Sequence, residues 1–318
     1  MEPTIHDVFL ARQRIAPYLK RTPLLHPAAL GRRLGSDAYV KCENLQPVGA
    51  FKVRGGINLA AAEGASLKQR GLTAASTGNH GQSVAYAAAT FGLRATIFAP
   101  AGANPLKVAA MEALGAEVRL VGRDFDEARE ACERFAADTG ARYVHSMNEP
   151  LLIAGVATAY LEALEEVPDL EVILVPIGGG SGASGASIVA KSLNPRLRVV
   201  GVQAEGAPAV YRSFHSRRLE STERVETIAE GLATRVAFEL PLSILWRYLD
   251  DVVLVSDAEL QAAMRLLLET THTVAEAAGA AATAAAMRYP ELVTGRKVLL
   301  PISGGNATLE QLRTALTE

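Results

Sequence analysis

The stretch that decides the fold is VILVP at residues 172–176, followed by IGGGSG at residues 177–182. A short apolar run that ends at such a turn signal is consistent with a buried β-strand. The glycine-rich turn after it leads into a segment with a helical pattern. Strand, glycine turn and helix in this order are typical of a parallel α/β sheet, in which ligands bind beyond the carboxyl ends of the strands.

The same alternation runs along almost the whole chain. We expect further strands at residues 38–42, 72–75, 95–98, 117–121, 142–145, 199–203, 252–255 and 297–301. Near one face of a first helix lie Ile5, Val8, Phe9, Ile15 and Leu19. Another helix covers residues 82–92, and a capping box of Ser256 and Glu259 starts a helix that reaches about Thr270. The pattern predicts an α/β protein with parallel twisted sheets flanked by helices.

Length and composition describe an ordinary folded protein. The chain has 318 residues, enough for roughly two domains, with 49% hydrophobic and 21% charged residues and a formal net charge of −2. These values exclude a disordered chain and give no sign of a nucleic-acid or membrane-surface partner. No secretory signal is visible, and Cys42 and Cys132 form no motif, so we expect a cytoplasmic protein with reduced thiols.

Glycine-rich turns follow three of the expected strands. They are STGNHG at residues 76–81, GGGSG at residues 178–182 and SGGN at residues 303–306, the last of which we expect to open the final helix. One such turn is weak evidence for any function. Three in one chain indicate a single ligand that is contacted from several sides.

One interpretation of the second turn is a nicotinamide dinucleotide site. Gly180, Gly182 and Gly185 match G-x-G-x-x-G, and Glu205 follows at the spacing of a ribose-binding acid. The additional glycines suit a compact phosphate better, and the other two turns would have no role.

A second interpretation is a hydrolase. Ser181 lies one residue away from a nucleophile-elbow pattern, and Asp251 and His272 follow in a suitable order. Such an order arises easily by chance.

A third interpretation explains all three turns and begins at NLQPVGAFKVRGG, residues 44–56. Phe51 and Val53 flank Lys52 and would desolvate its amine, which lowers the pKa and leaves a neutral nucleophile. Lysine forms the Schiff base with pyridoxal phosphate, a cofactor that also needs a phosphate site and a partner for its ring nitrogen. The remaining turns can supply both.

These residues resemble the fold-type II pyridoxal-phosphate enzymes, in particular the threonine/serine dehydratase and serine racemase group. The likeness runs through KCENLQ (41–46), FKVRG (51–55), residues 76–82, EP (149–150) with IAG (153–155), the turn at 178, IAEG (228–231), Glu276 and residues 303–306. It implies a two-domain fold like that of the tryptophan synthase β chain. Residues 47–148 would form a small domain inserted into a large cofactor-binding domain of residues 1–46 and 149–318.

The resemblance also implies roles for individual residues. Lys52 would hold the cofactor and move the substrate α-proton, Phe51 would pack on the ring, Asn79 would contact its phenolic oxygen, and Ser303 its pyridine nitrogen. The phosphate would bind the backbone of Gly178, Gly179, Gly180, Ser181 and Gly182, and the substrate carboxylate that of Ser76, Thr77, Gly78, Asn79 and His80. Glu276 matches a position near the cofactor, although a helix-cap carboxylate is an equal interpretation.

The implied reaction is a dehydration that turns L-threonine or L-serine into 2-oxobutanoate or pyruvate and ammonia. Racemases of the group have serine where this chain has Thr77, which keeps a hydroxyl that could act as a second proton carrier. Metal-dependent relatives have carboxylates where this chain has Gln203 and Ala209, so we expect no divalent metal there. The alternatives left open are a racemase, a dehydratase of 3-hydroxyaspartate or phenylserine, and a non-catalytic protein that binds the cofactor. We expect a homodimer.

Overall fold

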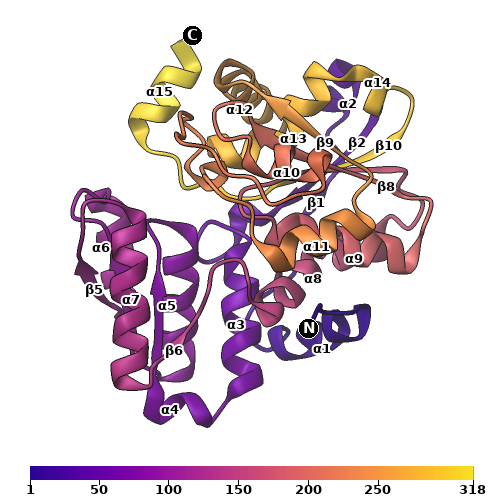
Figure 1. The fold of residues 1–318 in the computed structure, drawn as a ribbon. Helices are drawn as coiled ribbons and strands as arrows, with labels where there is room; N and C mark the ends of the chain where they lie inside the picture. Colours follow the sequence, from indigo (N-terminus) through magenta and orange to yellow (C-terminus); the bar gives the residue numbers. More distant parts are fainter. Residues whose placement is uncertain (318) are drawn as a thin grey trace.

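The computed structural model describes residues 1–317, and these form two β-sheets with helices on both faces of each (Figure 1). The six-stranded sheet has the order β1-β2-β10-β7-β8-β9, and the four-stranded sheet the order β5-β4-β3-β6. Every pair of neighbouring strands is parallel except β1 and β2. The predicted α/β class with parallel sheets is therefore confirmed.

The six-stranded sheet is assembled from both ends of the chain. Its strands are β1 (Leu24–Leu25), β2 (Asp37–Cys42), β7 (Val172–Pro176), β8 (Arg198–Ala204), β9 (Asp251–Val255) and β10 (Lys297–Ile302). The prediction for β7 is correct at both ends, and those for the other four parallel strands are correct to within a residue at each end. Strand β1 was not predicted, because two residues are too few to show an alternating pattern.

Alternating side chains of the central strands divide the core into two layers. Val172 and Leu174 pack with the helices on one face, whereas Ile173 and Val175 pack with those on the other. The first face carries α2 (Ala28–Leu34), α12 (Asp257–Thr271), α13 (Ala277–Arg288), α14 (Pro290–Val293) and α15 (Leu309–Thr317). The second carries α1 (Ile5–Ile15), α8 (Pro150–Glu166), α9 (Ser181–Leu193), α10 (Ala209–Ser216) and α11 (Glu239–Tyr248).

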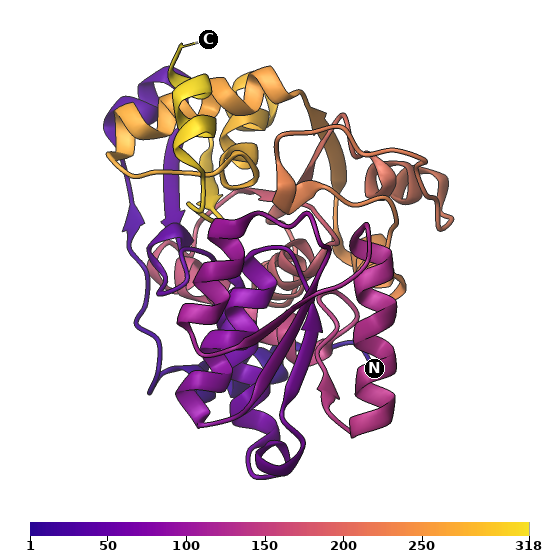
Figure 2. The ribbon, with the colours of Figure 1, turned by 90° about the vertical axis from the view of Figure 1, so that its left-hand side faces the viewer.

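The four-stranded sheet lies wholly between residues 72 and 143. Its strands are β3 (Leu72–Ala75), β4 (Ala95–Ala99), β5 (Glu117–Leu120) and β6 (Arg142–Tyr143), and its helices are α3 (Lys52–Glu63), α4 (Ser66–Arg70), α5 (Asn79–Phe91), α6 (Pro105–Ala113) and α7 (Phe125–Thr139). Single 3₁₀ turns, η1 (Glu43–Leu45) and η2 (Glu230–Leu232), belong to the other part of the chain. Figures 1 and 2 show this smaller part below the helices α12–α15.

Side-chain caps explain where helices begin. Ser256 caps α12 as predicted. Helix α5 begins three residues earlier than expected, because the Ser76 hydroxyl accepts the N–H groups of Gly78 and Gly81. The last helix does not open at the SGGN turn but at Leu309, since Thr308 and Gln311 exchange backbone-to-side-chain hydrogen bonds there.

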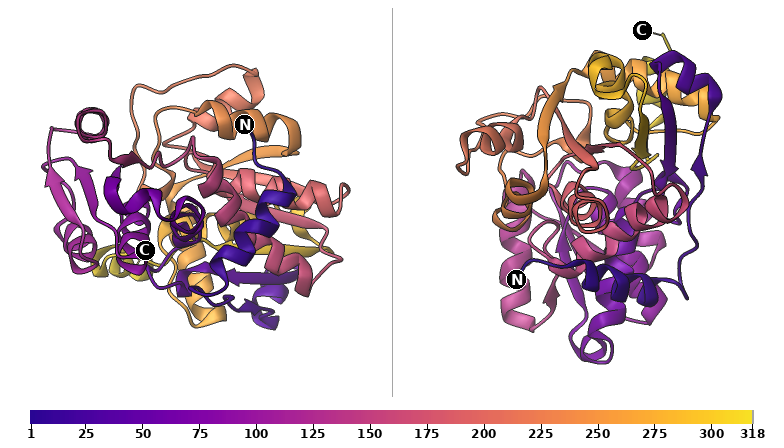
Figure 3. Two further views of the ribbon diagram at one scale, coloured as in Figure 1. Left: turned by 90° about the horizontal axis from the view of Figure 1, so that it is seen from below. Right: turned by 90° about the vertical axis from the view of Figure 1, so that its right-hand side faces the viewer.

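Helix α3 is held by glycines where it crosses its neighbours. A Cβ atom at Gly155 of α8 would lie 2.6 Å from the Arg54 carbonyl oxygen, and one at Gly56 would lie 2.6 Å from the carbonyl of Ser83 in α5. Figure 3 shows α1 passing beside this group of helices, and Val8 of α1 packs with Ile153 of α8. The backbone of α3 is thus in direct contact with both parts of the molecule.

Candidate active site

The three glycine turns meet around the start of α3. The Phe51 N–H donates to the Ser303 carbonyl at 3.0 Å, and Ala50 forms a β-bridge with Gly304. The Asn306 amide donates to the Asn79 side-chain oxygen at 2.8 Å. Because the turns follow β3, β7 and β10, the carboxyl ends of three strands from two sheets enclose one site.

Lys52 is the first residue of α3, and its amine faces the second turn. Its Nζ donates to the Ser181 hydroxyl at 2.8 Å and to the Ser146 carbonyl at 3.4 Å, and it lies 5.3 Å from the centre of the Phe51 ring. Within residues 1–317 no carboxylate pairs with this amine. Burial lowers the pKa of Lys52 to about 8, because no counter-charge offsets the lost hydration.

The turn at residues 178–182 offers a row of backbone donors at the N-terminus of α9. In the described part of the chain, the N–H groups of these five residues donate to no carbonyl or side chain. A Cβ atom would collide with the Gly231 carbonyl at Gly178 and with the Met147 sulfur at Gly179, and Gly180 has a φ of 100°. Only glycine fits at these three positions. Unpaired backbone donors at the start of a helix suit a phosphate.

Asn79, Glu276 and Ser303 form a polar group at the third glycine turn, where a Cβ atom at Gly304 would collide with the Glu276 carboxylate. The Asn79 amide donates to Glu276 Oε1 at 2.8 Å, and Ser303 Oγ lies 3.5 Å from the Ala278 carbonyl. Glu276 is the N-cap residue of α13, but its side chain makes no cap hydrogen bond. Burial raises the pKa of its carboxyl group, and the neighbouring Glu230 adds to this effect.

The turn at residues 76–80 has fewer free donors than the sequence indicated. The Ser76 N–H donates to the Phe98 carbonyl and the Gly78 N–H to the Ser76 hydroxyl. In the described chain the N–H groups of Thr77, Asn79 and His80 have no acceptor. The buried His80 imidazole contacts the Val144 carbonyl at 3.0 Å, and its pKa falls to about 3 through burial and through the nearby Lys52, so it is a neutral structural group.

Two features of this site gave no clear signal in the sequence. Asn306 orients Asn79 and also donates to the Val48 carbonyl at 2.8 Å, whereas the SGGN motif that contains it indicates only a turn. Lys107 of α6 forms an ion pair with Glu230 of η2 and lies beside Gly78, where a Cβ atom would be 3.8 Å from its Nζ. No pattern links two residues that are 123 positions apart.

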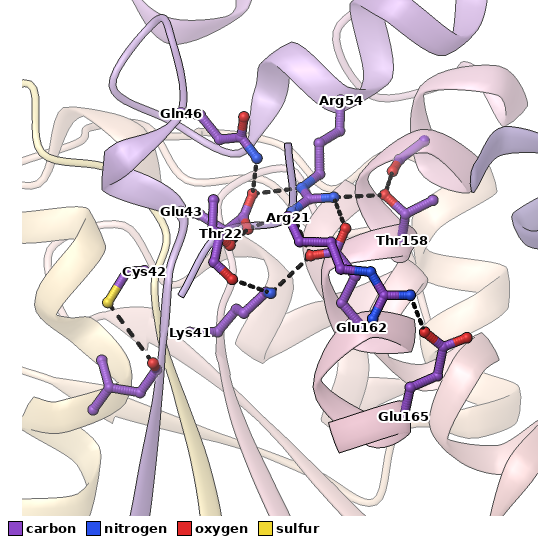
Figure 4. Close-up of polar contacts among 12 residues, drawn as sticks. Arg21, Thr22, Lys41, Cys42, Glu43, Gln46, Arg54, Thr158, Glu162 and Glu165 are labelled. Atoms are coloured by element: carbon purple, nitrogen blue, oxygen red, sulfur yellow. Dashed lines mark hydrogen bonds and ion pairs between the residues drawn. The ribbon is translucent and has the colours of Figure 1, made fainter. Parts of the chain in front are cut away.

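Figure 4 shows a buried charge cluster of Lys41, Glu43, Arg54 and Glu162. The Arg54 guanidinium donates to both oxygens of Glu43 and both oxygens of Glu162 at 2.7 to 2.9 Å, and to Thr158 at 3.1 Å. Lys41 donates to Glu162 at 2.7 Å and to the Thr22 carbonyl at 2.8 Å. The cluster joins α3 to β2, η1 and α8, two residues beyond Lys52.

The residues of the two rejected interpretations are used otherwise. A Cβ atom at Gly185 would lie 2.9 Å from Ala157 Cα, so this glycine serves helix packing, and Glu205 pairs with Arg288 at 2.6 Å. Ser181 accepts a hydrogen bond from Lys52, and His272 is the left-handed C-cap residue of α12. Neither a dinucleotide site nor a hydrolytic triad is assembled from them.

The site thus defines a class of enzyme. An amine with a lowered pKa, an adjacent aromatic ring, five backbone donors that have no acceptor in the described chain and a polar group at the third turn fit an aldehyde cofactor with a phosphate arm. In the described residues no group of histidine, cysteine and carboxylate side chains could hold a metal, and no helix is long and apolar enough to cross a membrane.

Comparisons with known proteins identify the family within this class. The sequence profile of the family "Pyridoxal-phosphate dependent enzyme" matches residues 15–304, and the chain belongs to this family. L-threonine ammonia-lyase of Thermotoga maritima is 41% identical over 97% of this chain and 77% of its own. L-threo-3-hydroxyaspartate ammonia-lyase of Saccharomyces cerevisiae is 35% identical over 99% of this chain and 97% of its own. Maize serine racemase has the same fold, with a TM-score of 0.94, 30% identity and coverage of 99% and 97%. The cofactor is pyridoxal phosphate, and the protein is a fold-type II lyase of the ammonia-lyase group.

Proposed function

We propose that the protein converts L-threonine, L-serine or both to 2-oxobutanoate or pyruvate and ammonia. Ammonia-lyases named for threonine are among the most similar relatives. The observation that carries the proposal is the Lys52 amine, which faces the turn at residues 178–182 and has no carboxylate partner among residues 1–317.

Lys52 is proposed to bind the cofactor and to move the substrate α-proton. When bound, pyridoxal phosphate supplies an electron sink for bonds at the α-carbon of an amino acid. With a pKa of about 8, a measurable fraction of the Lys52 amine is free base at neutral pH, so the side chain can accept a proton. The Ser181 hydroxyl and the Ser146 carbonyl hold Nζ in place on two sides.

The remaining cofactor contacts divide between the turns. We propose that the N–H groups of residues 178–182 bind the phosphate, that Phe51 packs on the ring, and that Asn79 and Ser303 contact its oxygen and nitrogen. Glu276 would fix the Asn79 amide, to which it is hydrogen-bonded. The neutral Ser303 hydroxyl cannot hold the ring nitrogen protonated as a carboxylate would, which favours prompt loss of the β-substituent.

The substrate carboxylate is proposed to bind the start of α5. Three N–H groups, of Thr77, Asn79 and His80, remain free there, whereas those of Ser76 and Gly78 are engaged within the turn. The positive end of the helix dipole favours an anion at this place. The Thr77 hydroxyl would face the substrate.

We also propose that residues 47–148 form a small domain inserted into a large one of residues 1–46 and 149–318. The complete four-stranded sheet falls inside the first range, which supports these boundaries. A cytoplasmic location is supported by two buried free thiols. A homodimer rests on the family resemblance alone, and light scattering on the purified protein tests it.

A substrate with a second carboxylate, such as 3-hydroxyaspartate, is the alternative. Lys107 lies beside the proposed substrate turn, and a yeast relative is named for that substrate. Racemisation of serine is a further alternative, because Thr77 keeps a hydroxyl in the turn.

The test is an assay of the purified holoenzyme with L-threonine, L-serine and L-threo-3-hydroxyaspartate. Threonine or serine should yield one molecule of oxo acid for each molecule of ammonia. Chiral analysis of the serine reaction should find little D-serine. Borohydride reduction should attach the cofactor to Lys52. Turnover of 3-hydroxyaspartate alone would contradict the proposed substrates. A borohydride adduct at another residue would contradict the assignment of Lys52.

A further inference from the structure

His145 lies two residues after the end of strand β6 and has no role in the function proposed above. Its half-buried ring makes edge contacts with Tyr143 and, from the other part of the molecule, with Phe238, at centroid distances of 5.9 and 5.4 Å. Its Nδ1 accepts two backbone N–H groups, those of Met147 and Asn148, each at 3.0 Å. A nitrogen that accepts two donors carries no proton, so the neutral ring holds its proton on Nε2.

Each residue of the segment 146–148 makes a different contact, two with the site and one between the two parts of the molecule. The Ser146 carbonyl accepts from Lys52 Nζ at 3.4 Å. The Met147 side chain fills the space that a Cβ atom at Gly179 would need. The Asn148 amide oxygen accepts the Leu240 N–H at 3.3 Å, which joins the two parts of the molecule.

We propose that His145 is a positioning residue, whose unprotonated Nδ1 fixes the segment 146–148 and thereby the carbonyl that faces the Lys52 amine. This inference rests on the proposed role of Lys52. The strand ends at Tyr143 and the chain has to reverse before α8, so two hydrogen bonds to one ring nitrogen define the path of three residues.

Protonation of the ring would reverse these contacts. Imidazolium has two N–H donors and no acceptor, so both backbone donors would then face a third N–H. The charged or titratable groups that face the ring are Lys52 on α3, His80 on α5, and Arg129 and Glu133 on α7. Burial lowers the pKa of His145, Glu133 opposes this shift, and Arg129 and Lys52 add to it, which favours the neutral ring that the two hydrogen bonds to Nδ1 require.

Three variants separate positioning from general stability. His145→Asn places an acceptor oxygen close to the position of Nδ1 and does not titrate, whereas His145→Ala removes the acceptor. His215→Asn is the control. The His215 ring also has aromatic neighbours, but its polar contacts in the described chain are with the Val252 carbonyl and Asp251, both outside the site. Thermal unfolding of each holoenzyme reports whether the fold is retained.

The kinetic readout is the pH profile of kcat/KM. The wild type should show an acid limb that includes His145 protonation, and His145→Asn should lose that component. A misplaced reacting group costs on the order of 10² in rate, so His145→Ala should lower kcat by roughly that factor, and His145→Asn should recover most of it. His215→Asn should leave rate and profile unchanged. An unchanged acid limb in His145→Asn would overturn the proposal.

The second readout needs neither cofactor nor activity. The chain has six histidines, and ¹⁵N imidazole spectra of the cofactor-free protein report which ring nitrogens are protonated. The signals that disappear in the His145→Asn spectrum are those of His145. His145 should show an unprotonated Nδ1 and a protonated Nε2 at neutral pH. A protonated Nδ1 would overturn the proposal, whereas a borohydride adduct away from Lys52 would overturn the proposed function and leave this spectrum as it is.

Discussion

Lys52 and Arg54 lie two residues apart on α3, and both are cations in the interior, but their surroundings are opposite. The Arg54 guanidinium is fully buried and meets the oxygens of Glu43 and Glu162 at hydrogen-bond distance. The Lys52 amine meets one hydroxyl and one carbonyl. The pKa of Arg54 is therefore raised by its carboxylates, whereas that of Lys52 is lowered by burial.

The difference separates a structural charge from a chemical one. A paired arginine cannot lose its proton, and Arg54 attaches α3 to Glu43 and Glu162 in the larger part of the molecule. An unpaired lysine can exist as a free amine, which is the form that attacks an aldehyde. The same helix start thus holds a fixed cation and, two residues earlier, a titratable one.

The largest expected effect tests the chemical side of this comparison. Lys52→Ala should lower kcat by on the order of 10⁴ or more, because proton transfer and cofactor attachment are both lost. Thermal unfolding of the cofactor-free proteins should change little, since the amine has no ion-pair partner in the part of the chain that the structure describes. Turnover near the wild-type level would contradict the assignment of Lys52.

Arg54→Met tests the structural side. Removal of one partner leaves Glu43 and Glu162 buried without their main counter-charge, which costs about 3–5 kcal/mol in the free energy of unfolding. Denaturant titration measures this cost. The matched control is Arg123→Met, whose exposed pair with Glu127 should contribute nothing measurable. Equal stability of the two variants would show that the buried charge cluster does not hold α3.

The pH dependence of cofactor capture sharpens the comparison without any mutation. Cofactor-free protein should bind pyridoxal phosphate covalently at a rate that rises with pH and levels off above about 8, because only the neutral Lys52 amine reacts. Borohydride trapping at short times gives the rate. A midpoint near 10 would mean that Lys52 is as hydrated as a surface lysine.

Glu276→Gln gives the smallest expected effect. The pKa of Glu276 is raised in the folded protein, so its contribution to stability is present below the unfolded pKa and is lost as the pH rises through the folded pKa. Glutamine does not titrate and can still accept from Asn79. The variant should therefore gain thermal stability relative to wild type as the pH rises above the unfolded pKa of about 4.5. A relative loss over this range would mean that the carboxylate is stabilised in the fold.

Much of the fold could be predicted because the parallel strands are short, apolar and bounded by turn residues. Strands β3 and β7 were predicted to the residue. The strand predicted at residues 142–145 ends at Tyr143, because the His145 ring turns back to cap the following backbone, and such a contact leaves no periodic pattern. The same holds for the start of α5 at Asn79, which the Ser76 hydroxyl determines.

The candidate site was predictable as far as its motifs reach. Lys52, Asn79, the turn at residues 178–182 and Ser303 are each marked by nearby glycines, and the structure brings them together. Contacts between separate segments could not be found in this way. Glu162 lies 108 residues from Arg54, and Lys107 lies 123 residues from Glu230, so only the folded chain shows that they are partners.

These separations have a consequence for biosynthesis. On the ribosome, chains grow at about 5–20 residues per second. Because Glu162 lies 108 positions after Arg54, it is synthesised roughly 5–20 s later. The Ser303 carbonyl that accepts from Phe51 is made later still, after both Arg54 and Glu162. The nascent chain therefore carries an incomplete vitamin B6 site until strand β10 has emerged, and the complete site cannot hold the vitamin before that point.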